Sequence, residues 1–203
     1  MRKPMRTGIL IAGALMLGGC EYKSTPDPVL SARDQQFISM VPTADMGVNF
    51  ARYQVDDPTG QAPGTIVVNT KDKLLFYVLP GGKAMRYGVA TGAEAYGWTG
   101  TATIRWMAEW PRWMPPADMV KRWPHLKPVA AAGGMQGGPE NPLGARALYL
   151  YDAAGKDTLY RIHGTNEPTE IGHDASSGCI RMRDIDVIDL YGRAKVGTKV
   201  MVL

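Results

Sequence analysis

The chain has few residues that could bind a metal ion or form a disulfide. It contains 2 cysteines, Cys20 and Cys179, and 3 histidines among 203 residues. A zinc hydrolase that uses His163, His173 and Cys179 is one alternative, but these residues lack the short i, i+3 or i, i+4 ligand pair. The glycine-rich run at 130–138 lacks the lysine of a phosphate-binding loop. We therefore expect no metal ion and no organic cofactor.

A hydrophobic run long enough to span a membrane is also lacking. A spanning helix needs roughly 20 apolar residues, and the apolar stretch Gly8–Leu17 is far shorter. It follows three basic residues and ends in Leu17-Gly18-Gly19-Cys20, which resembles the lipobox of bacterial lipoproteins. We expect residues 1–19 to be a signal peptide cleaved before Cys20, and Cys20 to carry a lipid that anchors the chain to an envelope membrane. An ordinary signal with a coincidental cysteine is the alternative.

The chain has little net charge once this signal is removed. Its formal charge is +4, and the signal contains three basic residues and no acidic residue, which leaves +1. No basic stripe with interleaved aromatic residues is present, so nucleic-acid binding is not expected. With Cys20 lipidated, Cys179 would be a solitary thiol in an oxidising compartment, which favours a chemical role over simple packing.

From residue 64 onward the sequence predicts one domain of mostly β structure. Short apolar runs separated by glycine or proline are typical of a sandwich or a closed barrel, and about 140 residues are enough for one core. One helix, with Asp184 or Asp186 as its N-cap residue, is expected to pack on the sheet behind the site, with no chemical role. The expected strands are Thr65–Asn69, Lys73–Leu79, Ala84–Ala90, Thr101–Trp106, Ala145–Tyr151, Thr158–His163, Cys179–Met182 and Thr198–Leu203.

Two other segments have distinctive compositions. Residues 20–63 are rich in proline, aspartate and serine, which predicts a tether and lead-in with one short helix near Ala32–Met40. Trp106–Pro128 contains four tryptophans and five prolines, which excludes a long strand or helix across it. Such a segment suits either a lid that lines a substrate groove or a flap that packs its tryptophans into a satellite core.

The stretch His163–Met182 combines a thiol, an imidazole, small residues and a cation. Cys179 follows Gly178 at the start of one predicted strand, and His163 ends another, so adjacent strand ends would bring the two side chains together. An imidazole that accepts the thiol proton leaves a strong nucleophile. The backbone carbonyl of Gly164 is the nearest group that could orient the imidazole through its other ring nitrogen.

Other residues of the stretch could bind a substrate. Backbone N–H groups of Ser177, Gly178 and Cys179 could converge on an oxyanion. Arg181 shares a strand face with Cys179, within reach of a substrate carboxylate. Taken singly, a buried cysteine or a strand histidine is more often structural, and Arg181 could be a surface cation. Further candidate substrate contacts are Ser176, Trp98 and Trp110.

The order of these residues resembles a known family. His163-Gly164-Thr165 followed by Ser176-Ser177-Gly178-Cys179-Ile180-Arg181-Met182 is similar to the signature of the L,D-transpeptidase catalytic domain, whose cysteine enzymes remodel bacterial peptidoglycan. The flanks, including Gly97-Trp98-Thr99-Gly100, are also similar, so the resemblance covers residues 64–203. One position departs from the family, because many members have a histidine where this chain has Ser177.

The resemblance implies a β-sandwich or partly closed barrel with one or two short helices, in a periplasmic enzyme of cell-wall biogenesis and cell shape. Cys179 would form a thioester with a tetrapeptide stem of peptidoglycan, release D-alanine and transfer the acyl group to an amine acceptor, while His163 moves the protons. Its partners would be donor and acceptor stem peptides. A hydrolase that uses water as acceptor and a wall-binding lipoprotein without turnover are the alternatives.

Overall fold

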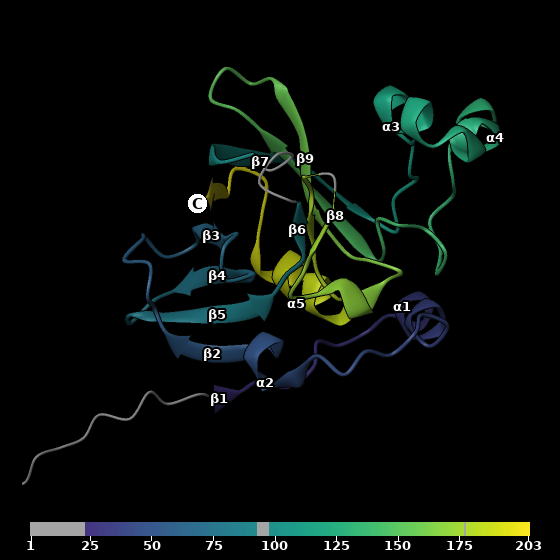
Figure 1. Ribbon diagram of the computed structural model, residues 1–203. Helices are drawn as coiled ribbons and strands as arrows, with labels where there is room; N and C mark the ends of the chain where they lie inside the picture. Colours follow the sequence, from purple (N-terminus) through teal and green to yellow (C-terminus); the bar gives the residue numbers. More distant parts are fainter. Residues whose placement is uncertain (1–22, 93–97, 177) are drawn as a thin grey trace, which may run out of the picture.

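The computed structural model describes residues 23–92, 98–176 and 178–203, which form a mostly β fold (Figure 1). Ten strands form one sheet in the order β1-β2-β5-β4-β3-β12-β7-β8-β9-β11, and β10 pairs with β6. Cys20, the predicted site of lipid attachment, lies outside the described residues. The strands are β1 Lys23–Ser24, β2 Tyr53–Asp56, β3 Ile66–Asn69, β4 Leu74–Leu79, β5 Lys83–Gly88, β6 Thr91–Gly92, β7 Gly100–Glu109, β8 Arg146–Tyr151, β9 Asp157–His163, β10 Asp174–Ser176, β11 Ile180–Arg181 and β12 Lys199–Val202.

The helices are short, and within the described ranges they are more numerous than the one or two that were expected. No helix there is long and apolar enough to cross a membrane. The α-helices are α1 Ala32–Ile38, α2 Gly47–Phe50, α3 Ala117–Arg122, α4 Lys127–Ala131 and α5 Asp184–Arg193, and the 3-10 turns are η1 Pro124–Leu126 and η2 Pro168–Glu170.

The large sheet is curled but does not close into a barrel. Its central strand β12 runs parallel to β3 and antiparallel to β7, and the β-branched run Ile66-Val67-Val68 of β3 is buried on both faces, as suits the middle of a packed sheet. Two backbone hydrogen bonds of 2.8 and 2.9 Å connect Ala90, just after β5, with Arg181 on β11. This contact brings the last strand of the sheet back to the chain that follows β5.

Helix α5 packs on β8 and β9 behind the site, as the sequence predicts. Val187 and Leu190 join Leu148 and Ile162 in the core. The predicted N-cap residue was wrong, because Arg183 is the N-cap residue and makes no side-chain capping bond. The carboxylates of Asp184 and Asp186 instead bind groups elsewhere in the fold.

The lead-in that the sequence predicts to be a tether is folded against the domain from residue 23. Ser31 and Asp34 form a capping box that starts α1. The Asp34 carboxylate is only 2% exposed, and it accepts hydrogen bonds from Arg146 at 2.9 Å and from the indole N–H of Trp110 at 2.8 Å. Composition could not reveal this contact, because the partners lie far along the chain.

The proline-rich segment forms an excursion of short helices beside the sheet, where α3 and α4 stand apart from the other elements (Figure 1). Its longest helix has six residues, which confirms that the prolines exclude a long one. The preceding strand β7 extends to Glu109, so Trp106 belongs to the sheet and not to the excursion.

Candidate active site

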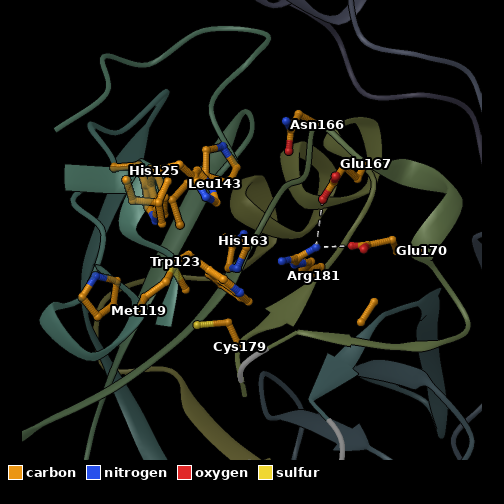
Figure 2. A pocket seen from close by; sticks show the side chains of 15 residues that line it. Met119, Trp123, His125, Leu143, His163, Asn166, Glu167, Glu170, Cys179 and Arg181 are labelled. Atoms are coloured by element: carbon orange, nitrogen blue, oxygen red, sulfur yellow. Dashed lines mark hydrogen bonds and ion pairs between the residues drawn. The ribbon is translucent and has the colours of Figure 1, made fainter. Parts of the chain in front are cut away.

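Cys179 and His163 line one cavity of about 560 Å³ on the outer face of the sheet (Figure 2). The strands beneath it fix their relative positions. Strand β11 runs parallel to β9 with Arg181 opposite His163, so Cys179, just before β11, lies beside Arg161. Neighbouring strands are about 4.8 Å apart. The structure therefore brings the thiol and the imidazole into one compartment. The cavity is lined by Trp113, Pro116, Met119, Trp123, His125, Leu126, Pro142, Leu143, His163, Asn166, Glu167, Glu170, Ala175, Cys179 and Arg181.

The imidazole of His163 is held in one tautomer by the backbone. Its Nδ1 lies 2.6 Å from the carbonyl oxygen of Gly164. Because a carbonyl oxygen can only accept, Nδ1 carries the hydrogen and Nε2 keeps a lone pair. Burial, helped by the charge of Arg181, lowers the pKa of His163 to about 3 against the opposing effect of the Gly164 carbonyl. The resting imidazole is therefore neutral and able to accept a proton.

The thiol of Cys179 is also neutral at rest. It is half-buried, and its sulfur lies 4.0 Å from the carbonyl oxygen of Leu159. Burial raises the pKa of the thiol, while the backbone and charge of Arg161 and the charge of Arg181 act in the opposite direction. A neutral thiol beside a neutral base suits proton transfer during attack on a carbonyl.

A protein-family model matches the part of the chain that builds this site. The family model described as "YkuD: L,D-transpeptidase catalytic domain" matches residues 63–202. The chain belongs to the L,D-transpeptidase catalytic domain family. The match starts one residue before the domain boundary that the sequence predicts.

Curated relatives of this L,D-transpeptidase domain are longer proteins. The "Probable L,D-transpeptidase ErfK/SrfK" of Escherichia coli K12 is 31% identical over 145 residues, which are 68% of this chain and 43% of that protein. The "Probable L,D-transpeptidase YcfS" of the same organism is also 31% identical, with the same coverage of each chain. The chain thus spans less than half the length of these relatives.

Solved structures share the fold. A crystal structure described as a "Probable carnitine operon oxidoreductase caia" from Brucella melitensis is 46% identical, covers 78% of this chain and 96% of that chain, and has a TM-score of 0.53. An L,D-transpeptidase from Enterococcus faecium has a TM-score of 0.50 at 16% identity and covers 70% of this chain and 50% of that chain. The second likeness concerns the fold alone.

The turn before the nucleophile has a backbone that only glycine adopts easily. Gly178 has φ +120°, which L side chains rarely adopt. Ser176 ends β10, and Ser177 lies outside the described residues. The oxyanion role of the amides at 177, 178 and 179 in this L,D-transpeptidase domain thus stays a prediction.

Arg181 lines the cavity and is anchored by two acidic residues. Its guanidinium forms ion pairs with Glu170 and, at 3.4 Å, with Glu167 (Figure 2). A substrate carboxylate would have to share this guanidinium with two carboxylates, which the sequence alone did not indicate. Its role in substrate binding stays a prediction.

The two tryptophans predicted to contact substrate lie elsewhere. Trp110 is 4% exposed and packs edge-on against Phe37 at 4.9 Å, so its predicted substrate contact is replaced by a structural one. Trp98 stacks on Tyr160 and lines a neighbouring cavity together with Gly178. From the excursion, Trp113 and Trp123 are the tryptophans that line the Cys179 cavity. The segment therefore combines both predicted alternatives, cavity lining and core packing.

Asp184 is a residue of the site that the sequence indicated only as a helix cap. Its Oδ1 accepts hydrogen bonds from the amides of Ala145 at 2.8 Å and Thr165 at 3.2 Å, and its buried Oδ2 has no partner among the described residues. Gly164 and Gly144 leave the space that this carboxylate fills, because a Cβ on either would collide with it. Asp184 thereby fixes the amide that directly follows the Gly164 carbonyl and ties it to the neighbouring chain at Ala145.

The metal-binding alternative finds no support in the described part of the chain, where no group of three or more His, Cys, Asp or Glu residues could hold a metal ion. His173, the third ligand of that alternative, does not line the cavity of Cys179 and His163. The arrangement is suited to nucleophilic chemistry by a thiol and a base.

Proposed function

We propose that the chain is a peptidoglycan L,D-transpeptidase with Cys179 as nucleophile and His163 as proton acceptor and donor. One observation carries the proposal: a thiol and a neutral imidazole from adjacent strands line the same cavity, and the imidazole has its free lone pair on Nε2. Membership of the family supports the substrate class, because the matched domain is described as an L,D-transpeptidase catalytic domain.

The first half of the reaction forms a thioester. Nε2 of His163 takes the thiol proton as the sulfur of Cys179 attacks the carbonyl carbon of the third residue of a tetrapeptide stem. Amides of residues 177–179 stabilise the oxyanion of the tetrahedral intermediate. The carbon–nitrogen bond to the terminal D-alanine then breaks, and the leaving amine takes the proton back from His163.

The second half transfers the acyl group. An amine of an acceptor stem gives a proton to Nε2 of His163 and attacks the thioester carbonyl, and the sulfur leaves and is protonated again. The residues that hold His163 in its tautomer act in both halves, because the same nitrogen receives and returns each proton. A hydrolase would follow the same path with water as the acceptor.

The cellular location follows from the predicted signal. We expect the chain to be exported and held in the bacterial envelope by a lipid on Cys20, facing the periplasm and the wall. Mass spectrometry of the N-terminal peptide from native membranes tests this, since an unmodified Cys20 or an uncleaved signal contradicts it.

The experiment that tests the catalytic proposal uses intact-protein mass spectrometry. Incubation with a carbapenem should add the full mass of the drug to Cys179, because the strained ring opens onto the sulfur without losing a leaving group. With a tetrapeptide stem and an amine acceptor, the protein should release D-alanine and form the transfer product. Cys179→Ala should remove both reactions, with a loss of at least about 10³-fold.

The outcomes separate the competing functions. Release of D-alanine without any transfer product, at saturating amine, would identify a hydrolase. No acylation and no release by a correctly folded protein would identify a wall-binding protein and overturn the proposal. Turnover that survives Cys179→Ala would exclude the thiol as nucleophile.

A further inference from the structure

A row of side chains crosses the outer face of the sheet and ends at the nucleophile. Trp106 on β7 lies opposite Tyr149 on β8, and Tyr149 lies opposite Arg161 on β9. The parallel pairing of β11 with β9 places Cys179 beside Arg161. Residues opposite one another on neighbouring strands point to the same face. We call Trp106, Tyr149 and Arg161 the aromatic row.

The aromatic row is a rigid stack. The ring centroids of Trp106 and Tyr149 are 4.1 Å apart with 25° between the ring planes. The guanidinium of Arg161 covers the same phenol ring at 4.6 Å from its centroid, and two hydrogen bonds of 2.7 and 2.8 Å hold it to Asp157. The rotamers of all three side chains are therefore fixed before any ligand arrives.

The outermost ring of the row is open to solvent. Trp106 is 55% exposed, whereas Tyr149 beneath it is 9% exposed. On the other side of β7, β12 pairs only with the segment from Gly100 to Thr103, so among the described strands none borders Trp106 there. The fold thus presents one indole, supported from behind, on the sheet face that contains Cys179.

We propose that the aromatic row binds a sugar ring of the glycan strand that carries the donor stem peptide. The inference rests on the proposed function, because it specifies that the donor substrate is a stem peptide still attached to its glycan strand. A pyranose has an apolar face of C–H groups and a rim of hydroxyls, and a fixed indole offers matching apolar area with polar surroundings. The occupant is therefore a carbohydrate.

The length of the stem fits the length of the row. Strands β11 and β7 are three strand intervals apart, and at about 4.8 Å each this separates Cys179 from Trp106 by roughly 14 Å. The third stem residue reacts at Cys179, and three extended residues span at most about 10–11 Å. The short link from the first residue to the sugar covers the remaining few ångströms. A stem that lies along the row thus delivers its sugar to Trp106.

Paired substrates test the proposal in the full-length protein. One is the free tetrapeptide, and the other is the same tetrapeptide attached to its disaccharide. Trp106→Ala should lower kcat/KM about tenfold for the disaccharide substrate, equivalent to about 1.4 kcal/mol, and leave the free tetrapeptide unaffected. Trp106→Phe keeps a ring and should recover most of the loss. Val48→Ala, at an exposed position of α2 beside the far end of the sheet (Figure 1), should change neither substrate.

A binding measurement separates this inference from the catalytic proposal. In a Cys179→Ala background, stem-free glycan oligomers should shift the NMR signal of the Trp106 indole N–H, and Trp106→Ala should weaken their binding about tenfold. Glycan binding without turnover by the wild type would retain the aromatic row and overturn the catalytic proposal. If Trp106→Ala lowers kcat/KM equally for both substrates, or for neither, the aromatic row is not a sugar site. A loss of self-association by Trp106→Ala in sedimentation would instead assign the row to contact with a second copy of the chain and would also overturn the proposal.

Discussion

A single backbone carbonyl decides which nitrogen of His163 reacts. The Gly164 oxygen lies 2.6 Å from Nδ1, and this contact assigns the hydrogen to Nδ1 and the lone pair to Nε2. A carboxylate in this place would favour the imidazolium, whereas a neutral carbonyl combined with burial keeps the ring neutral. The site therefore has a base that stays uncharged until the thiol proton is transferred.

The lowered pKa of His163 predicts an unusual pH profile for acylation. Because the ring keeps its lone pair down to about pH 3, kcat/KM for carbapenem acylation should show no step near 6.5, the ordinary pKa of histidine. Stopped-flow acylation between pH 5 and 8 measures this. An ascending limb centred near 6.5 would show that His163 titrates normally and would contradict the neutral resting pair. The tautomer can be checked by ¹⁵N NMR of the ring.

Among the secondary-structure elements, α5 has the least expected connection to the site. Its first residue, Asp184, does not cap the helix but bridges the amides of Ala145 and Thr165. These amides flank the start of β8 and the end of β9, so the start of one helix ties together the two segments that position Gly164. The helix that was assigned no chemistry therefore supports the base indirectly.

Replacement of Asp184 by asparagine should change how stability depends on pH. Burial raises the pKa of Asp184 from 3.8 to about 6. The protonated carboxyl therefore contributes its full stability below pH 3.8, and this contribution is lost as the pH rises through about 6. The shift of about two units corresponds to roughly 3 kcal/mol at most. Asp184→Asn cannot ionise, and its free energy of unfolding should improve relative to wild type between pH 4 and pH 8.

Chemical denaturation at pH 4, 6 and 8 measures that difference. An equal pH dependence of wild type and Asp184→Asn would show that the pKa of Asp184 is not raised in the folded protein and would contradict the assignment. Asp72→Asn, at an exposed turn, is the control and should give no such divergence between the two ends of the pH range.

Some of these elements could be predicted from local sequence and others could not. His163 ends a strand and Cys179 precedes one, and a glycine adjoins each of them. The alternation of apolar and polar residues together with these glycines was enough to predict both positions. The tryptophans carry no such local mark. Trp106, Trp110 and Trp123 look alike in sequence, yet one is on the sheet face, one is in the core and one lines the cavity. Their places depend on tertiary packing.

For the molecule as a whole, the lead-in packs on the catalytic domain across the described residues. Asp34 and Arg146 are 112 residues apart in sequence, and no local pattern joins them. Burial raises the pKa of Asp34, but hydrogen bonds from Arg146, Ser31 and Trp110 outweigh it and hold the pKa well below its ordinary value. The ionised carboxylate thus links α1 to the beginning of β8, close to the chain that builds the cavity.

Removal of this carboxylate should destabilise the whole protein. Asp34→Ala leaves the buried Arg146 without its main partner, and the loss of one member of a buried ion pair typically costs about 3–5 kcal/mol. Asp45→Ala, at an exposed position of the same lead-in, should cost less than about 0.5 kcal/mol. Urea denaturation followed by tryptophan fluorescence measures both free energies of unfolding. A loss in Asp34→Ala no larger than that of Asp45→Ala would mean that the lead-in is a tether after all, as its composition suggests.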